Sequence, residues 1–235
     1  MKRLVVFDVD GTLTLTMGLD AVLYVEAVKQ VLDIDQVNTD WSVYRHVTDS
    51  GVAAELIEHH FRRPAQPSEI ESVRDRFLTL MDSALTADGQ RYQPLPGAPE
   101  ILSVLRAHPD FECAVATGAW RESALLKTRH AGLTIEDLPL ATADDSPQRE
   151  VILEIAVERA RSRYRLSKHG GVVYVGDGVW DVQAAHAAGV HFLGVGRGSQ
   201  ASDLRAAGAS TVVRDFTDID HFLGLLAGTD EGPNH

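Results

Sequence analysis

Short apolar segments alternate along most of the chain with longer segments whose apolar residues recur at helical spacing. The first apolar segment, Leu4–Asp8, contains adjacent β-branched valines and predicts a strand buried on both faces. Similar segments occur at Cys113–Thr117, Leu138–Thr142, Val172–Gly176, His191–Val195 and Thr211–Val213. Helical spacing occurs in Ala98–Ala107, Arg121–Ala131, Glu150–Tyr164, Val179–Ala188 and Ala201–Ala207. This alternation predicts an α/β fold in which helices cover both faces of a parallel sheet.

One interval, from about Gly18 to Gly89, interrupts the alternation. It contains no pattern of a buried strand, and its apolar residues have helical spacing in three segments, which are Leu19–Leu32, Val52–Phe61 and Glu69–Leu85. A Pro- and Gly-containing segment near Pro94 ends the interval. We therefore predict an α/β core domain formed by residues 1–16 and 94–228, with an inserted helical cap domain at 17–93. Residues 229–235, rich in Gly, Pro and charge, are expected to form a flexible tail.

Composition narrows the class of protein and its partners. The chain has 235 residues, 44% of them hydrophobic and 24% charged, which is typical of a globular protein somewhat larger than one average domain. Its formal net charge of −12 disfavours nucleic acid as a partner. A single cysteine, Cys113, suits a reducing cytoplasm, and no segment has the pattern of a signal peptide or a membrane-spanning helix. We expect a cytoplasmic protein, monomeric or homodimeric, that acts without a membrane.

Two carboxylates follow the first predicted strand directly. Asp8 ends the strand and Asp10 lies two residues further on, so both can project from the edge of the sheet where ligands bind. Gly11 permits the tight turn that follows. Carboxylates this close repel each other unless a cation or proton intervenes, and Mg²⁺ prefers such oxygen ligands. The pair suits phosphoryl transfer, in which one carboxylate attacks and the other moves a proton, although a capped turn would also contain two aspartates.

Polar residues also follow two other predicted strands. Thr117 and Gly118 lead from a strand into a helix, an arrangement that cradles phosphoryl oxygens but is also typical of an ordinary helix cap. Asp177 follows the strand Val172–Gly176, and Asp181 comes one helical turn later. Both are candidate metal ligands or residues that orient the ligands, with helix capping as the alternative for Asp177.

A cation is needed opposite the nucleophile and the phosphoryl group. Arg149 follows Pro147 at the predicted start of a helix after the third strand, where it can offset the charge of Asp8. A solvated surface arginine is the alternative interpretation. Lys168 is the competing candidate, although it lies near the start of a strand and therefore at the opposite end of the sheet.

In chain order these motifs resemble the haloacid dehalogenase superfamily of hydrolases. The sequence Asp8-Val9-Asp10-Gly11-Thr12 is similar to the first motif of that family, Thr117 to the second, and Gly176–Asp181 to the fourth. The third motif differs from the family pattern, because many relatives have Lys-Pro where this chain has Ser146-Pro147 with Arg149 nearby. The resemblance implies a Rossmann-like core with a helical cap, similar to the phosphoglycolate-phosphatase-like branch.

The resemblance also implies roles for the candidate residues. Asp8 would form an aspartyl-phosphate and Asp10 would act as general acid and base. Mg²⁺ would be held by Asp8, the backbone carbonyl of Asp10 and Asp177, with Asp181 in support. In this family an acid at the position of Asp10 favours phosphate chemistry over dehalogenation. The expected activity is hydrolysis of a small phosphorylated metabolite.

Three alternatives and one substrate contact stay open at this stage. The alternatives are a phosphomutase, a phosphonate hydrolase or a non-catalytic binding relative on the same scaffold. A phosphonate hydrolase needs a Schiff-base lysine, and Lys29 is the only lysine in the predicted cap. Within the cap, Arg45 is a candidate for pairing with a second anionic group on the substrate, although a surface loop is the simpler interpretation.

Overall fold

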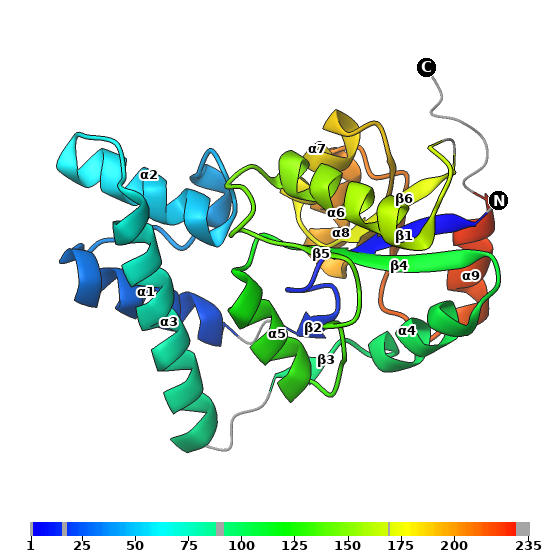
Figure 1. Ribbon diagram of the computed structural model, residues 1–235, viewed down its shortest axis with the longest axis horizontal. Helices are drawn as coiled ribbons and strands as arrows, with labels where there is room; N and C mark the ends of the chain where they lie inside the picture. Colours follow the sequence, from blue (N-terminus) through cyan, green and yellow to red (C-terminus); the bar gives the residue numbers. More distant parts are fainter. Residues whose placement is uncertain (1, 16–17, 88–91, 169, 229–235) are drawn as a thin grey trace.

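A six-stranded parallel sheet forms the centre of the protein (Figure 1). The computed structural model describes residues 2–15, 18–87, 92–168 and 170–228. The strand order is β5-β4-β1-β6-β7-β8. The strands are β1 (Arg3–Phe7), β4 (Phe111–Ala116), β5 (Leu140–Ala141), β6 (Val172–Gly176), β7 (His191–Val195) and β8 (Thr211–Val213). The predicted α/β fold is confirmed, and β5 is shorter than its apolar segment.

The alternation of side chains along β1 explains why helices cover both faces of the sheet. Leu4 and Val6 pack into one core with α6 (Arg149–Tyr164), α7 (Val179–Ala187) and α8 (Gly198–Ala206). Val5 and Phe7 point to the other face and pack with α4 (Ala98–Ala107), α5 (Arg121–His130) and α9 (Ile219–Gly228). The buried central strand is therefore apolar on both faces, as its sequence predicts.

Three helices lie together beyond the carboxyl ends of the strands, on the left in Figure 1. They are α1 (Leu19–Leu32), α2 (Asp49–Phe61) and α3 (Pro67–Ala87), with a short 3₁₀ helix η1 (Trp41–Val43) between the first two. Helix α2 begins three residues before the predicted segment, because the Thr48 side chain accepts a hydrogen bond from the Gly51 N–H. A small antiparallel ribbon of β2 (Thr14–Leu15) and β3 (Gln93–Pro94) was not predicted, since two-residue strands leave no periodic signal.

The start of α2 is attached to the loops that follow the strands. The Asp49 N–H donates a hydrogen bond to the Gly118 carbonyl at 2.7 Å, and the Asp49 side chain accepts one from the Trp120 N–H at 2.9 Å. The Ser50 hydroxyl donates to the Ala143 carbonyl at 2.8 Å. These bonds fix the helical segment over the edge of the sheet where the candidate residues lie.

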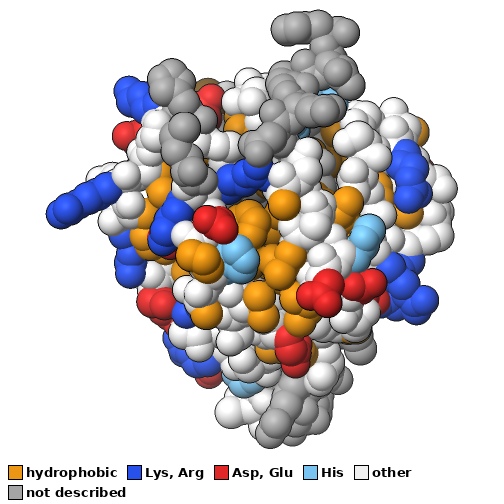
Figure 2. All heavy atoms as spheres, turned by 90° about the vertical axis from the view of Figure 1, so that its right-hand side faces the viewer, with side chains coloured by type: hydrophobic (Ala, Val, Ile, Leu, Met, Phe, Trp, Pro, Cys, Tyr) orange, Lys and Arg blue, Asp and Glu red, His pale blue; other side chains and the backbone are white. Residues whose placement is uncertain are grey.

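The opposite end of the molecule, where the strands begin, faces the viewer in Figure 2. Hydrophobic side chains there are interspersed with charges of both signs. In the described ranges, no helix is long and apolar enough to cross a membrane. The predicted tail at 229–235 and the predicted domain boundary at residues 16–17 fall outside the described residues.

Candidate active site

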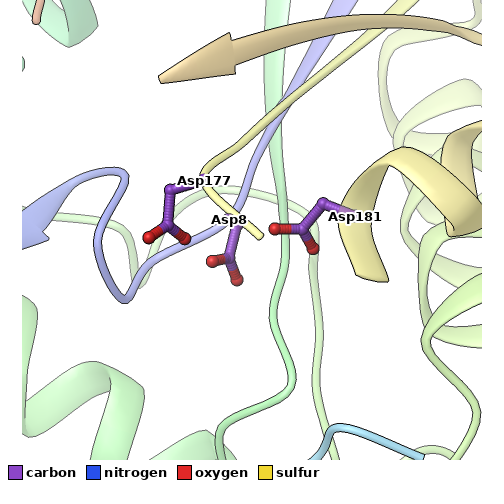
Figure 3. Close-up of side chains that lie close together, drawn as sticks. All are labelled: Asp8, Asp177 and Asp181. Carbon is purple, nitrogen blue, oxygen red and sulfur yellow. The ribbon is translucent and has the colours of Figure 1, made fainter. Parts of the chain in front are cut away.

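Three aspartates meet at the carboxyl edge of the sheet. Strand β1 lies between β4 and β6, so the residues that follow these strands share one edge. Oxygen atoms of Asp8, Asp177 and Asp181 all lie within 4.8 Å of one another. Figure 3 shows Asp8 between the other two, with Asp181 reaching it from helix α7. The structure therefore brings together the acidic residues of the first and last motifs.

Local hydrogen bonds orient two of these carboxylates. Asp181 accepts hydrogen bonds from the Tyr174 hydroxyl at 2.9 Å and from the Gly178 N–H at 3.0 Å, which fixes it at the start of α7. Asp177 accepts a hydrogen bond from the Gln200 side chain at 2.8 Å. Gly11 has φ +75°, and a Cβ atom there would lie 1.9 Å from an Asp177 oxygen. The first motif therefore needs glycine at this position both for its backbone conformation and for space.

Arg149 is the cation that the structure places beside Asp8. Its Nη1 lies 3.1 Å from Asp8 Oδ1, its Nε lies 3.5 Å from Asp181 Oδ1, and its side chain is only 11% exposed. A Cβ atom at Gly118 would lie 2.9 Å from the Arg149 guanidinium carbon, so glycine makes room for the arginine. Lys168 is exposed and precedes β6, at the other end of the sheet.

Burial makes this cluster electrostatically costly. It raises the pKa of Asp8 to about 7, although Arg149 acts to lower it. Burial, together with repulsion from Asp8 and Asp181, also holds the pKa of Asp177 well above its ordinary value. Clustered, buried carboxylates of this kind are stabilised by a divalent cation, and an all-oxygen donor set is the one that hard cations prefer. The residues present therefore fit a divalent metal.

Asp10 has a partner that the sequence analysis missed. Lys127, on α5, is only 2% exposed, and its Nζ lies 2.5 Å from Asp10 Oδ2 and 2.9 Å from Asp20 Oδ2. Burial acts to lower the pKa of Lys127, but attraction by Asp10 and Asp20 outweighs it, so the pKa lies well above its usual value. The other oxygen of Asp10, Oδ1, is buried without a hydrogen-bond partner in the described structure. Asp10 is thus fixed through one oxygen and free at the other.

A helical signal could have found Lys127. Ala124, Lys127, Thr128 and Ala131 are all buried, and they follow the i, i+3, i+4, i+7 spacing of the covered face of a helix. A lysine at such a position needs buried anionic partners. The basic residues around it, at the end of α5, make the segment resemble an ordinary solvated helix terminus.

The candidate residues surround a cavity of about 340 Å³ between the sheet edge and the three helices. Its described lining includes Asp8, Asp10, Asp20, Asp49, Thr117, Gly118, Lys127, Arg149, Asp177 and Trp180 on its polar side. Thr117 is buried, and its hydroxyl accepts a hydrogen bond from the Ala119 N–H at 3.3 Å. Arg45 does not line this cavity; it is exposed and pairs with Glu58 at 3.1 Å. Arg45 instead lines a neighbouring pocket of about 340 Å³, which shares Val47, Arg149 and Trp180 with the first cavity.

Comparisons with known proteins identify the family and the fold. A family model described as haloacid dehalogenase-like hydrolase matches residues 2–189. No curated protein matches the chain significantly. A hydrolase from Pseudomonas syringae is 20% identical, with 96% of this chain and 99% of that chain covered and a TM-score of 0.68.

Two further solved structures share the fold. A provisionally named β-phosphoglucomutase from Bacteroides vulgatus is 16% identical, with 98% of this chain and 90% of that chain covered and a TM-score of 0.68. A predicted phosphoglycolate phosphatase from Haemophilus somnus is 18% identical, with 94% of this chain and 98% of that chain covered and a TM-score of 0.58. At these identities the solved structures establish only the fold, and the match to the family model establishes that the chain is a member of the family. The chain belongs to the haloacid dehalogenase-like hydrolases, a family of enzymes.

Proposed function

We propose that this protein is a Mg²⁺-dependent phosphatase that hydrolyses a small phosphomonoester through an aspartyl-phosphate on Asp8. The observation that carries the proposal is the pair of carboxylates with separate partners. Asp8 lies beside the Arg149 guanidinium, whereas Asp10 is fixed by Lys127 and keeps one oxygen free. One carboxylate is therefore placed to meet a phosphoryl group, and the other to move a proton.

Mg²⁺ is the proposed metal because the site offers only oxygen donors from carboxylates and backbone. Asp8, Asp177 and the backbone carbonyl of Asp10 would hold the ion, with Asp181 in support. When bound, it would supply positive charge that offsets the negative charge of the phosphoryl oxygens. Asp181 supports indirectly, because its two oxygens are already engaged by Tyr174 and Gly178.

In the first proposed step an Asp8 oxygen attacks phosphorus, a phosphorus–oxygen bond forms, and the bond to the leaving oxygen breaks. Asp10, in its protonated form, gives its proton to that leaving oxygen. In the second step Asp10 takes a proton from water, whose oxygen attacks phosphorus and releases phosphate from Asp8. Arg149 and the Thr117–Gly118 turn would contact the phosphoryl oxygens throughout.

Lys127 is proposed as a positioning residue for Asp10. It binds Asp10 Oδ2 and also Asp20, in the first turn of α1, so that it connects the proton-transfer group to the helical segment. This contact limits the rotation of the Asp10 carboxylate. The helical segment, residues 17–93, is the proposed cap domain over the core of 1–16 and 94–228.

We further propose that the enzyme acts in the cytoplasm on a small phosphorylated metabolite, with neither nucleic acid nor membrane as partner, as a monomer or homodimer. The support is the net charge of −12 and the single cysteine, Cys113, which is buried. Burial raises the pKa of the Cys113 thiol to about 12, so the group stays protonated and unreactive at neutral pH.

The test is a panel of phosphomonoesters assayed for phosphate release, with and without Mg²⁺. Wild type is compared with Asp8→Asn and with Lys168→Ala, a surface change at the opposite end of the sheet. We expect Mg²⁺-dependent release by wild type and Lys168→Ala and none by Asp8→Asn. Undiminished release by Asp8→Asn would contradict the covalent route. Interconversion of phosphorylated sugars with little net phosphate release would favour a phosphomutase instead.

A further inference from the structure

The side of the cavity that faces away from the strand ends is apolar and aromatic. Tyr24, Trp41, Val52 and Phe77, all from the helical segment, line it. The Tyr24 ring centroid lies 5.8 Å from that of Trp41 and 5.8 Å from that of Phe77, so the rings support one another. We call these four residues the aromatic wall. Such a wall gives favourable contacts to an apolar or planar group and offers no strong partner for an anion.

Both cations that line the cavity are already paired. Among its described lining residues the cations are Lys127 and Arg149. Lys127 contacts the carboxylates of Asp10 and Asp20. Arg149 contacts Asp8 and lies near Asp181, at the end of the cavity proposed for the phosphoryl group. Neither is available to pair with a negative charge at the aromatic wall.

Carboxylates, by contrast, extend to the aromatic wall. Asp20 and Asp49 line the cavity, and each is close in sequence to a wall residue, namely Tyr24 and Val52. Arg45, which sequence analysis suggests for a second anionic group, lies outside the cavity in an ion pair with Glu58. An anion on the leaving group would therefore be buried at the aromatic wall without an unpaired cation among the described lining residues.

On the basis of the proposed phosphatase activity, we infer that the substrate's leaving group is neutral and partly apolar, with no second negative charge. The aromatic wall attracts such a group, and the described lining residues offer no unpaired cation to an anionic one. Phosphorylated carboxylic acids and bisphosphates are thereby excluded as good substrates. The inference also disfavours a phosphomutase, which must hold a second phosphoryl group away from Asp8.

The test uses two esters that match in size and differ in charge, 4-carbamoylphenyl phosphate and 4-carboxyphenyl phosphate. The carboxylate ester is expected to have a kcat/KM lower by about tenfold or more, because burying a carboxylate without a paired cation carries a desolvation cost. Binding is measured separately with the two corresponding phosphonates, which cannot be hydrolysed. Quenching of tryptophan fluorescence reports their dissociation constants, since Trp41 and Trp180 line the cavity.

A positive charge added to the aromatic wall should weaken the preference for the uncharged ester. Trp41→Arg places a cation in the cavity and is expected to narrow the difference between the two esters. Val43→Arg is the matched control: Val43 is in the same short helix, is 54% exposed and does not line the cavity, so the difference should persist.

The outcomes separate this inference from the proposed function. Equal kcat/KM values, or a preference for the carboxylate ester, would overturn the inference and leave the phosphatase intact. If other esters release phosphate but neither aryl ester is cleaved, the dissociation constants of the two phosphonates provide the test. Equal dissociation constants for the carbamoyl and the carboxylate phosphonate would overturn the inference. If no ester of any kind depends on Asp8 for hydrolysis, the proposed function fails and the inference fails with it.

Discussion

The two sides of the cavity are built in different ways. The core side consists of residues that directly follow strands, such as Asp8, Thr117 and Asp177, and they are set by the register of a parallel sheet. The cap side consists of helical residues, such as Tyr24 and Phe77, that pack by their rings. Charge and hydrogen bonds are concentrated on the first side, and apolar surface on the second.

This difference indicates that the two sides have separate roles, in catalysis and in substrate recognition. The core side can place charged atoms accurately, because strand ends and glycine turns leave little freedom. The aromatic wall on the cap side offers shape and apolar contact, which suits recognition of the part of a substrate that does not react. Changes on the core side should therefore reduce turnover, and changes on the cap side should alter the preference among substrates.

The largest expected effect comes from Asp8→Asn. Loss of the nucleophile should lower kcat by at least about 10⁴-fold. The variant should unfold at a temperature no lower than wild type, because the substitution removes repulsion between buried carboxylates. Phosphate release and thermal unfolding are measured side by side. A variant that is folded and still active would show that the core side does not act as described.

Arg149→Ala should have the next largest effect. Loss of the cation beside Asp8 is expected to lower kcat by about 10²–10³-fold, as for removal of other groups that stabilise a transition-state charge. Arg149→Lys should recover only part of the activity, because an ammonium group cannot contact both Asp8 and Asp181 as the guanidinium does. Steady-state kinetics gives kcat for Arg149→Ala and Arg149→Lys, with Lys168→Ala as the control. A greater loss of kcat in Lys168→Ala than in Arg149→Ala would show that Lys168, and not Arg149, is the essential cation.

Lys127→Met tests the connection between the two sides. It leaves Asp10 and Asp20 without their buried partner and should lower the free energy of unfolding by about 3–5 kcal/mol. It should also lower kcat by about tenfold or more, because Asp10 loses its orientation. Arg129→Met is the matched control on the same helix, where an exposed ion pair with Glu136 contributes about 0–1 kcal/mol.

Urea unfolding of the two variants gives the comparison directly. Equal losses of stability would contradict a structural role for the buried lysine. A destabilised variant with unchanged kcat at low temperature, where it is still folded, would contradict the positioning role of Lys127.

The smallest effect is expected on the cap side. Trp41→Ala should raise KM about three- to tenfold for an aryl phosphate while kcat changes little, because uniform binding to the leaving group is lost. Val43→Ala, an exposed neighbour in the same short helix, should leave both constants unchanged. A fall in kcat alone would show that the aromatic wall takes part in the chemical step.

The same contrast explains what the sequence could predict. Strands buried on both faces, and the residues that end them, produce strong local patterns, so the sheet and the approach of Asp8 to Asp177 follow from the sequence. The position of Arg149 also follows, since it begins a helix after a strand at the same edge.

The contacts that helices make around the cavity could not be predicted in this way. The contact of Lys127 with Asp10 joins α5 to the first motif across 117 residues, and no local pattern encodes that distance. The aromatic wall combines residues of α1, η1, α2 and α3 whose spacing only indicates that they are buried. Arg45 has the chemistry expected of a substrate contact, yet the fold of its loop directs it to Glu58 outside the cavity. Tertiary packing of helices, rather than sequence periodicity, decides which side chains meet.

In the proposed mechanism, Asp8 on the core side receives the phosphoryl group. This transfer is tested most directly by acid-quenching the Mg²⁺-loaded enzyme during turnover and measuring the mass of the peptide that contains Asp8. A fraction of that peptide should be heavier by one phosphoryl group, and this heavier form should be absent without substrate and in Asp8→Asn. Steady turnover with no heavier peptide, or the added mass on another residue, would contradict the mechanism.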